Sequence, residues 1–144
     1  REDTQNSIKR YKISEGDVVI SIAGTIGVTV PIDASLDGVN LTENAAKIVP
    51  KDRGSVDPTY LSYALQTAQA QSQITGQTGK ATIGKLALFR IEKIVVPLPP
   101  IEKQREFSGT VEKIRKHRAI MQAHATELDN FFAALQQKAF SGDL

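Results

Sequence analysis

Residues 99–144 read PPIEKQREFSGTVEKIRKHRAIMQAHATELDNFFAALQQKAFSGDL, and this stretch carries the clearest periodic pattern in the sequence. Between residues 107 and 139, ten positions are spaced alternately by four and three residues, and nine of the ten are apolar. A repeat of 3.5 residues keeps one stripe of an α-helix facing a partner helix, as in a coiled coil. We name this stripe the seam. Its large members, which we expect to make the helix pairing, are Phe107, Val111, Ile114, Met121, Leu128, Phe132 and Leu135.

The limits of this helix also follow from the sequence. Pro99 and Pro100 precede it and Ser141-Gly142 follows it, as is usual at helix ends. At 1.5 Å per residue, about 40 residues extend roughly 60 Å, which is longer than a domain of about 100 residues can cover. Part of the seam therefore needs another helix, either from the same complete protein or from a partner. The single charged seam residue, Arg118, is expected to select register or partner.

The first 98 residues predict a small mixed domain. The β-branched run at residues 18–22, the turn at residues 24–27 and the apolar residues 28–30 favour a β-hairpin. Residues 45–49 and 91–96 are two further predicted strands. Asp57-Pro58 favours a helix start, and the helix is expected to continue through the glutamine-rich residues 69–77. The predicted apolar face of this helix is Tyr60, Leu61, Ala64, Leu65 and Ala68.

The fold class expected is therefore α+β, with a mixed domain over residues 1–98 and one long coiled-coil-forming helix over residues 99–144.

The composition excludes several kinds of functional site. The chain has 144 residues, a net charge of +2 and no cysteine, and its two histidines both lie in the predicted long helix. Disulfides, thiol nucleophiles, cysteine-based zinc sites and serine–histidine catalysis are excluded. We expect no cofactor and no metal.

No stretch approaches the roughly 20 apolar residues of a membrane span, and no signal-peptide pattern opens the chain. We therefore expect a cytoplasmic protein with no membrane partner. The chain begins at Arg1 rather than at methionine, so we also expect it to be processed or to be a piece of a longer protein.

Two motifs only superficially suggest catalysis. Residues 57–60, DPTY, are similar to the Asp-Pro-Pro-Tyr motif of amino-methyltransferases, but no glycine-rich cofactor loop accompanies them. A capped helix start with a core tyrosine is the better interpretation. Residues 24–27, GTIG, lack the lysine and hydroxyl residue of a phosphate-binding P-loop, which favours a hairpin turn.

Basic residues cluster at 80–93 and at 112–118, where either a solvated face or contact with phosphates would explain them. The loop at residues 77–82 adds hydroxyl and amide groups that can read base edges. The candidate DNA-binding residues are Thr25, Asn40, Thr42, Asn44, Gln77, Thr78, Lys80, Thr82 and Lys85.

Four stretches, in order, resemble the specificity subunit of type I restriction–modification systems. They are the strand and turn at residues 16–27, the helix start at 57–65, the proline-rich junction at 96–105 and the ending at 138–144. The resemblance implies a target recognition domain, here expected to lack its N-terminal part, joined to a spacer helix. It implies a non-catalytic, sequence-specific DNA-recognition subunit that reads half of a split target.

The partners implied are double-stranded DNA, the adenine methyltransferase subunits that dock on the spacer helix, and the restriction/translocase subunit. The spacer helix is also implied to pair antiparallel with that of a second recognition unit or of an identical chain. An alternative is a structural module that does not bind DNA and oligomerises through the long helix, which the near-neutral charge favours. An autonomous methyltransferase is a third interpretation, and it requires cofactor binding.

Overall fold

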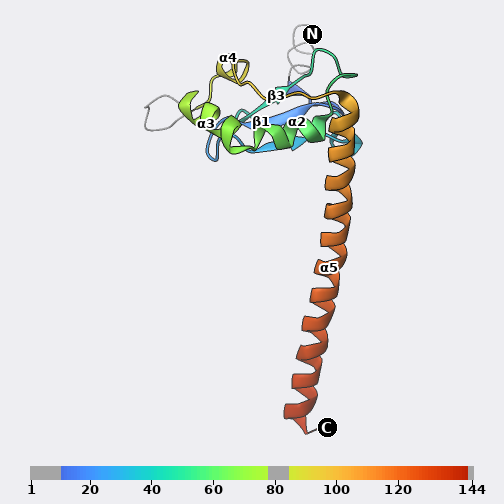
Figure 1. The fold of residues 1–144 in the computed structure, drawn as a ribbon. Helices are drawn as coiled ribbons and strands as arrows, with labels where there is room; N and C mark the ends of the chain where they lie inside the picture. The colour runs from blue at the N-terminus through green and yellow to red at the C-terminus, as the bar shows by residue number, and fades with distance from the viewer. Residues whose placement is uncertain (1–10, 78–84, 143–144) are drawn as a thin grey trace. The chain divides into compact units, whose positions relative to one another are not determined.

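The computed structural model describes residues 11–77 and 85–142, and these residues divide between two compact units with a boundary between Glu106 and Phe107. The first unit contains a small sheet with short helices, and the second contains most of one long helix (Figure 1). This confirms the predicted fold class. The elements are β1 (Val18–Ser21), β2 (Thr29–Pro31), the 3-10 turn η1 (Ala34–Leu36), β3 (Ala45–Ile48), α2 (Pro58–Leu65), α3 (Ala68–Gln77), α4 (Leu88–Ile91) and α5 (Ile101–Ser141).

The three strands form an antiparallel sheet in the order β2-β1-β3. Val19 pairs with Val30 on one side and with Lys47 on the other. Alternate residues of a strand face opposite sides, so Val18 and Ile20, both fully buried, point to the same face of the sheet. The predicted hairpin and the predicted third strand are both confirmed.

Helices α2 and α3 cover this face of the sheet, and polar groups help to fix them there. The Thr29 hydroxyl on β2 donates to the Ser62 carbonyl of α2 at 2.8 Å, and the Ser62 hydroxyl donates back to Thr29 Oγ1 at 3.1 Å. Both residues are buried. A buried polar pair is tolerated only when its hydrogen bonds are made, so this pair also fixes the position of α2 on the strand.

The β1–β2 turn needs glycine at position 27 for two reasons. Gly27 has a φ of +89°, and a Cβ built there would lie 2.7 Å from Gln71 Oε1. The Gln71 side-chain amide in turn donates to the Gly27 carbonyl at 2.9 Å and to the Leu65 carbonyl at 2.8 Å. Glycine thus allows α3 to approach closely enough to hold the turn.

The helix predicted as continuous from Pro58 is divided in two. Asp57 Oδ1 accepts from the Tyr60 N–H at 2.9 Å and caps α2 as expected. After Leu65 the chain breaks at Thr67, whose hydroxyl donates to the Ala64 carbonyl at 2.8 Å and accepts from the Ala70 N–H at 3.4 Å. Because one threonine side chain bonds both helices at the break, Ala68 starts a new helix and is exposed instead of joining the predicted apolar face.

The prediction of a strand over residues 91–96 is wrong. Ile91 ends the short helix α4, and the segment after it is irregular. The Gln73 side chain of α3 makes the backbone hydrogen bonds that a neighbouring strand would otherwise make. Its amide donates to the Val95 carbonyl, and its oxygen accepts from the Val95 N–H, both at 2.9 Å. Ile94 and Val96 still pack on the core, which explains the strand-like apolar alternation in this segment.

The long helix α5 begins at Ile101 and ends at Ser141, close to the predicted limits. Its first turn belongs to the first unit and carries the fully buried Gln104. The Gln104 side chain accepts from the Asp57 N–H at 2.9 Å and donates to the carbonyls of Ser55 and Pro99 at 3.0 and 2.7 Å. These bonds lock the start of α5 to the loop that precedes α2.

Candidate nucleic-acid interface

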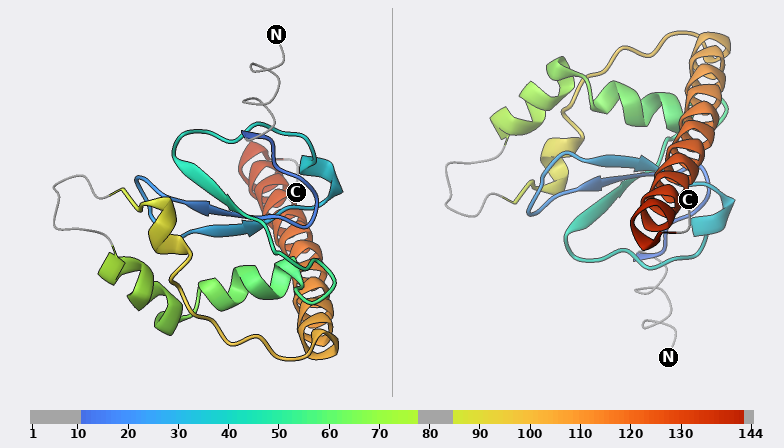
Figure 2. Two further views of the ribbon diagram at one scale, coloured as in Figure 1. Left: turned by 90° about the horizontal axis from the view of Figure 1, so that it is seen from above. Right: turned by 90° about the horizontal axis from the view of Figure 1, so that it is seen from below.

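Three segments meet where β1 leaves the sheet. The Ile22 N–H donates to the Asn44 carbonyl at 2.8 Å, and the Ile22 carbonyl accepts from the Leu86 N–H at 2.9 Å. The β1–β2 turn, the start of β3 and the segment before α4 are therefore joined at one end of the sheet (Figure 2). Loops held in this way by a rigid scaffold are the usual place for binding residues.

Three of the nine predicted DNA-binding residues lie at this end: Thr25 in the turn, Asn44 beside Ile22, and Lys85 beside Leu86. All three are exposed. We name them the sheet-end surface. Thr42 belongs to the turn that leads into β3, where its carbonyl accepts from the Ala45 N–H at 3.2 Å. It is also exposed.

The structure places two of the remaining predicted residues, Asn40 and Gln77, in other segments of the first unit. Asn40 forms an isolated β-bridge with Lys12, in another part of the loop that joins η1 to β3. Gln77 is the last residue of α3. Thr78, Lys80 and Thr82 lie outside the described residues.

The sequence analysis missed an exposed aromatic residue on α4. Phe89 is 58 % exposed, and two cations lie near its ring: Arg90 Cζ is 5.6 Å and Lys93 Nζ is 5.7 Å from the centroid. The nearby Leu86 is fully buried. The sequence signal was a phenylalanine among the basic residues 85–93, but an apolar residue in a short helix is normally expected to be buried.

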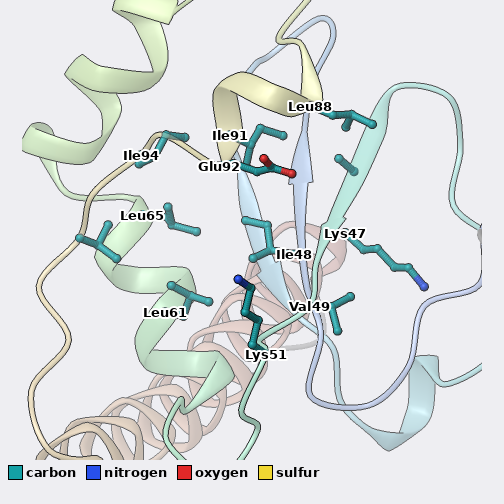
Figure 3. Close-up of a pocket in the computed structure, with 12 residues that line it drawn as sticks. Lys47, Ile48, Val49, Lys51, Leu61, Leu65, Leu88, Ile91, Glu92 and Ile94 are labelled. Carbon is teal, nitrogen blue, oxygen red and sulfur yellow. The ribbon is translucent and has the colours of Figure 1, made fainter.

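A pocket of about 710 Å³ opens between β3, α2, α4 and the segment after α4 (Figure 3). It is lined mainly by aliphatic side chains, and its charged lining residues are Lys47, Lys51 and Glu92. These residue types provide no nucleophile with an adjacent histidine or similar base. The pocket is suited to contact with an apolar surface.

The DPTY stretch has structural contacts. Asp57 caps α2, and the Tyr60 hydroxyl donates to the Pro97 carbonyl at 3.1 Å.

Within residues 11–77 and 85–142, no three or more histidine, cysteine or acidic side chains are grouped so that they could hold a metal ion. In the same part of the chain, no helix combines the length and the apolar character needed to cross a membrane.

The seam of α5 is mostly uncovered. Val111 is buried, but Ile114 is 54 % exposed, Met121 70 % and Leu128 69 %. Phe132 and Leu135 continue the exposed stripe toward the end of the helix. A contiguous apolar stripe of this length is typical of an interaction surface.

Comparison with known proteins identifies a family. The family model described as type I restriction modification DNA specificity domain matches residues 1–130. The chain is similar to the Type I restriction enzyme EcoBI specificity subunit of Escherichia coli, with 26% identity over 140 residues that cover 94% of the chain and 29% of that protein.

Two solved structures share the fold. The HsdS subunit from Thermoanaerobacter tengcongensis matches with a TM-score of 0.63 and 21% identity, covering 84% of this chain and 32% of that one. A chain from a structure that describes complex assembly and conformational transition of the type I R-M system matches with a TM-score of 0.62 and 20% identity, over 79% of this chain and 30% of that one. The chain therefore spans about three tenths of the length of these relatives.

Proposed function

This chain belongs to the type I restriction modification DNA specificity domain family, and we propose that it recognises DNA sequence without catalysing a reaction. In this proposal it reads one half of a split, double-stranded target for a type I restriction–modification complex. Adenine methyltransferase subunits and a restriction/translocase subunit supply the chemistry. The observation that carries the proposal is the family match, which extends over residues 1–130.

The sheet-end surface supports this proposal through its chemistry. Lys85 supplies a cation for a phosphate, while the hydroxyl of Thr25 and the amide of Asn44 can donate to or accept from base edges. The bonds of Ile22 to Asn44 and Leu86 hold the three segments together. We propose the other predicted residues, including Gln77, Thr78, Lys80 and Thr82 after α3, as further contacts.

Fluorescence anisotropy of the full chain, with its methyltransferase subunits, tests DNA recognition on duplexes of varied sequence. We expect sequence preference and an affinity that falls steeply as salt concentration rises. Lys80→Ala and Lys85→Ala should each reduce the salt slope by about one, and Thr82→Ala should reduce the sequence preference. Lys138→Ala, near the end of α5, is the matched control. Binding that depends on neither salt nor sequence would contradict the proposal.

We also propose that the seam pairs with the same helix of a second recognition unit. In a parallel pair of identical helices, Arg118 would face its own copy, which like-charge repulsion disfavours. In an antiparallel pair centred on Ala123, Arg118 instead lies opposite Leu128. In the same register Ile114 lies opposite Phe132, and Arg115 lies beside Asp129 of the second helix. Apolar packing and charge therefore favour the same antiparallel arrangement.

Single cysteines test this register, because the chain has none of its own. The antiparallel register brings Gln122 next to Gln122 of the second helix, while Ala123 lies on the far side of the helix from the seam. Under mild oxidation, Gln122→Cys should form disulfide-linked dimers much faster than Ala123→Cys. Faster cross-linking through Met121→Cys would indicate a parallel pair and overturn the register.

The exposed seam also favours a second candidate function, an oligomerisation module that does not bind DNA. The two functions differ in one measurable respect. If Lys80→Ala weakens DNA binding and Thr82→Ala reduces its sequence preference while the oligomeric state is unchanged, DNA recognition is supported. If the unaltered chain assembles but binds no duplex, the oligomerisation module is the better description. Cofactor binding measured by calorimetry would favour the methyltransferase interpretation instead.

A further inference from the structure

Phe89 is fixed in an exposed position by the residues around it. Two residues before α4, Leu86 is fully buried and bonded through its N–H to the Ile22 carbonyl at 2.9 Å. Within α4, Ile91 packs against the core cluster that contains Ile20 and Ile74. With both sides of the short helix anchored, the ring of Phe89 stays 58 % exposed and lies outside the pocket beneath α4.

The surroundings of this ring are basic. Arg90 and Lys93 are placed within 6 Å of its centroid, and Lys85 is exposed earlier in the same segment. The only acidic residue between positions 85 and 93 is Glu92, and it lines the pocket together with Leu88 and Ile91 (Figure 3). The exposed aromatic residue is therefore accompanied by an excess of positive charge.

We propose that Phe89 is a wedge that inserts between two adjacent base pairs of duplex DNA from the minor groove. This inference rests on the proposed function. Arg90 and Lys93 contact the phosphates on either side of the inserted ring, and Lys85 extends this contact toward the sheet-end surface. Inserted apolar side chains flanked by cations unstack a base step and bend the duplex. The phosphate contacts of these cations offset part of the cost of unstacking the bases.

Charge favours DNA over a protein as the occupant. A protein that covered Phe89 would have to place acidic groups or aromatic rings beside the two cations at its ring, whereas a duplex presents phosphates on both sides of every base step. The ring also needs no hydrogen-bond readout, since any base step offers stacking faces. The wedge therefore supplies bending and affinity, and the sheet-end surface supplies sequence preference.

The test compares two duplexes of about 30 base pairs that differ only in one abasic site, where unstacking is already complete. The full chain, with its methyltransferase subunits, should bind the abasic duplex about tenfold more tightly than the intact one. Phe89→Ala should lose most of this preference, and it should lose the bend measured by energy transfer between dyes at the duplex ends. Phe89→Trp should keep both.

Two controls isolate the wedge. Tyr11 is an aromatic residue of similar exposure, at 59 %, so Tyr11→Ala should leave preference and bend unchanged. Arg90→Gln and Lys93→Gln should lower affinity for both duplexes equally and reduce the salt slope by about one each. The melting temperature of each variant shows whether the fold is retained.

The outcomes separate this inference from the proposed function. If the unaltered chain binds duplex DNA and Phe89→Ala keeps both the preference and the bend, the wedge is overturned and DNA recognition stands. If Phe89→Ala loses association with a protein subunit but binds DNA normally, Phe89 is a protein contact and the wedge is again overturned. If the unaltered chain binds neither duplex, the proposed function itself fails.

Discussion

The two units of this protein place polar and apolar side chains in opposite ways. In the first unit, Gln104 is fully buried and makes three hydrogen bonds, and Thr29 and Ser62 bond each other in the core. In the second unit, Leu128 and Phe132 are more than 60 % exposed. In residues 11–77 and 85–106, the described part of the first unit, each buried side-chain polar atom has a hydrogen-bond partner. The helix presents apolar surface that only another molecule or segment can cover.

This contrast indicates where each kind of variant should act. A change on the seam should alter association and leave the folding of the first unit unchanged. A change at a buried polar group should alter stability before it alters association. The three predictions that follow test this separation, beginning with the largest expected effect.

Leu128→Lys should strongly weaken helix pairing. In the antiparallel register a pair loses two buried leucines, one from each copy, at about 2 kcal/mol each, and each new lysine faces Arg118 of the other helix with like charge. The dissociation constant should then rise by at least about a thousandfold, as measured by sedimentation. Asn130→Lys, on the face opposite the seam, is the control. If Leu128→Lys associates normally with its partners, the seam is not the pairing surface.

Gln104→Leu should destabilise the first unit by about 3 kcal/mol, because the Asp57 N–H and the carbonyls of Ser55 and Pro99 lose their partner. Urea unfolding followed by circular dichroism measures this change. Gln137→Leu, at an exposed position of α5, should change stability very little. Equal effects of the two variants would show that Gln104 does not anchor the start of α5.

The smallest expected difference in stability is between breaking a partly buried ion pair in the first unit and breaking an exposed ion pair in the second. Asp17 is buried and bonded to Arg53, so Arg53→Gln should lower the free energy of unfolding by about 2 kcal/mol. Glu112 and Lys116 are both exposed and 3.6 Å apart, so Glu112→Gln should cost less than about 0.5 kcal/mol. Chemical unfolding of both variants measures the difference. If Glu112→Gln lowered the free energy of unfolding more than Arg53→Gln does, stability would not depend mainly on the buried polar groups of the first unit.

Local signals in the sequence predicted much of the fold. The hairpin, the third strand, the Asp57 cap and the long helix each depend on residues close together in the chain, and the structure confirms them. One of the two errors, the missed helix break at Thr67, also rests on neighbouring residues, since the Thr67 hydroxyl bonds Ala64 and Ala70. The other error came from a contact between distant residues. Gln73 binds the backbone of Val95 across 22 positions, and this removes the need for the strand expected at residues 91–96.

The candidate site also combines residues that the sequence indicates with an arrangement that depends on contacts between distant residues. Thr25, Asn44 and Lys85 could be chosen from residue type alone, but their joining through Ile22 required the fold. Phe89 could not be chosen, because its exposure depends on the burial of Leu86 and Ile91. Contacts of this kind couple positions that no local pattern connects.

The sequence by itself determined the apolar seam and its length, because the geometry of an α-helix converts spacing directly into a surface. Only the tertiary structure decided which residues outside that helix are exposed. Burial in a small domain depends on which segments pack on which face of the sheet. It also depends on whether each buried polar group finds a partner, as Gln104 and Thr29 do.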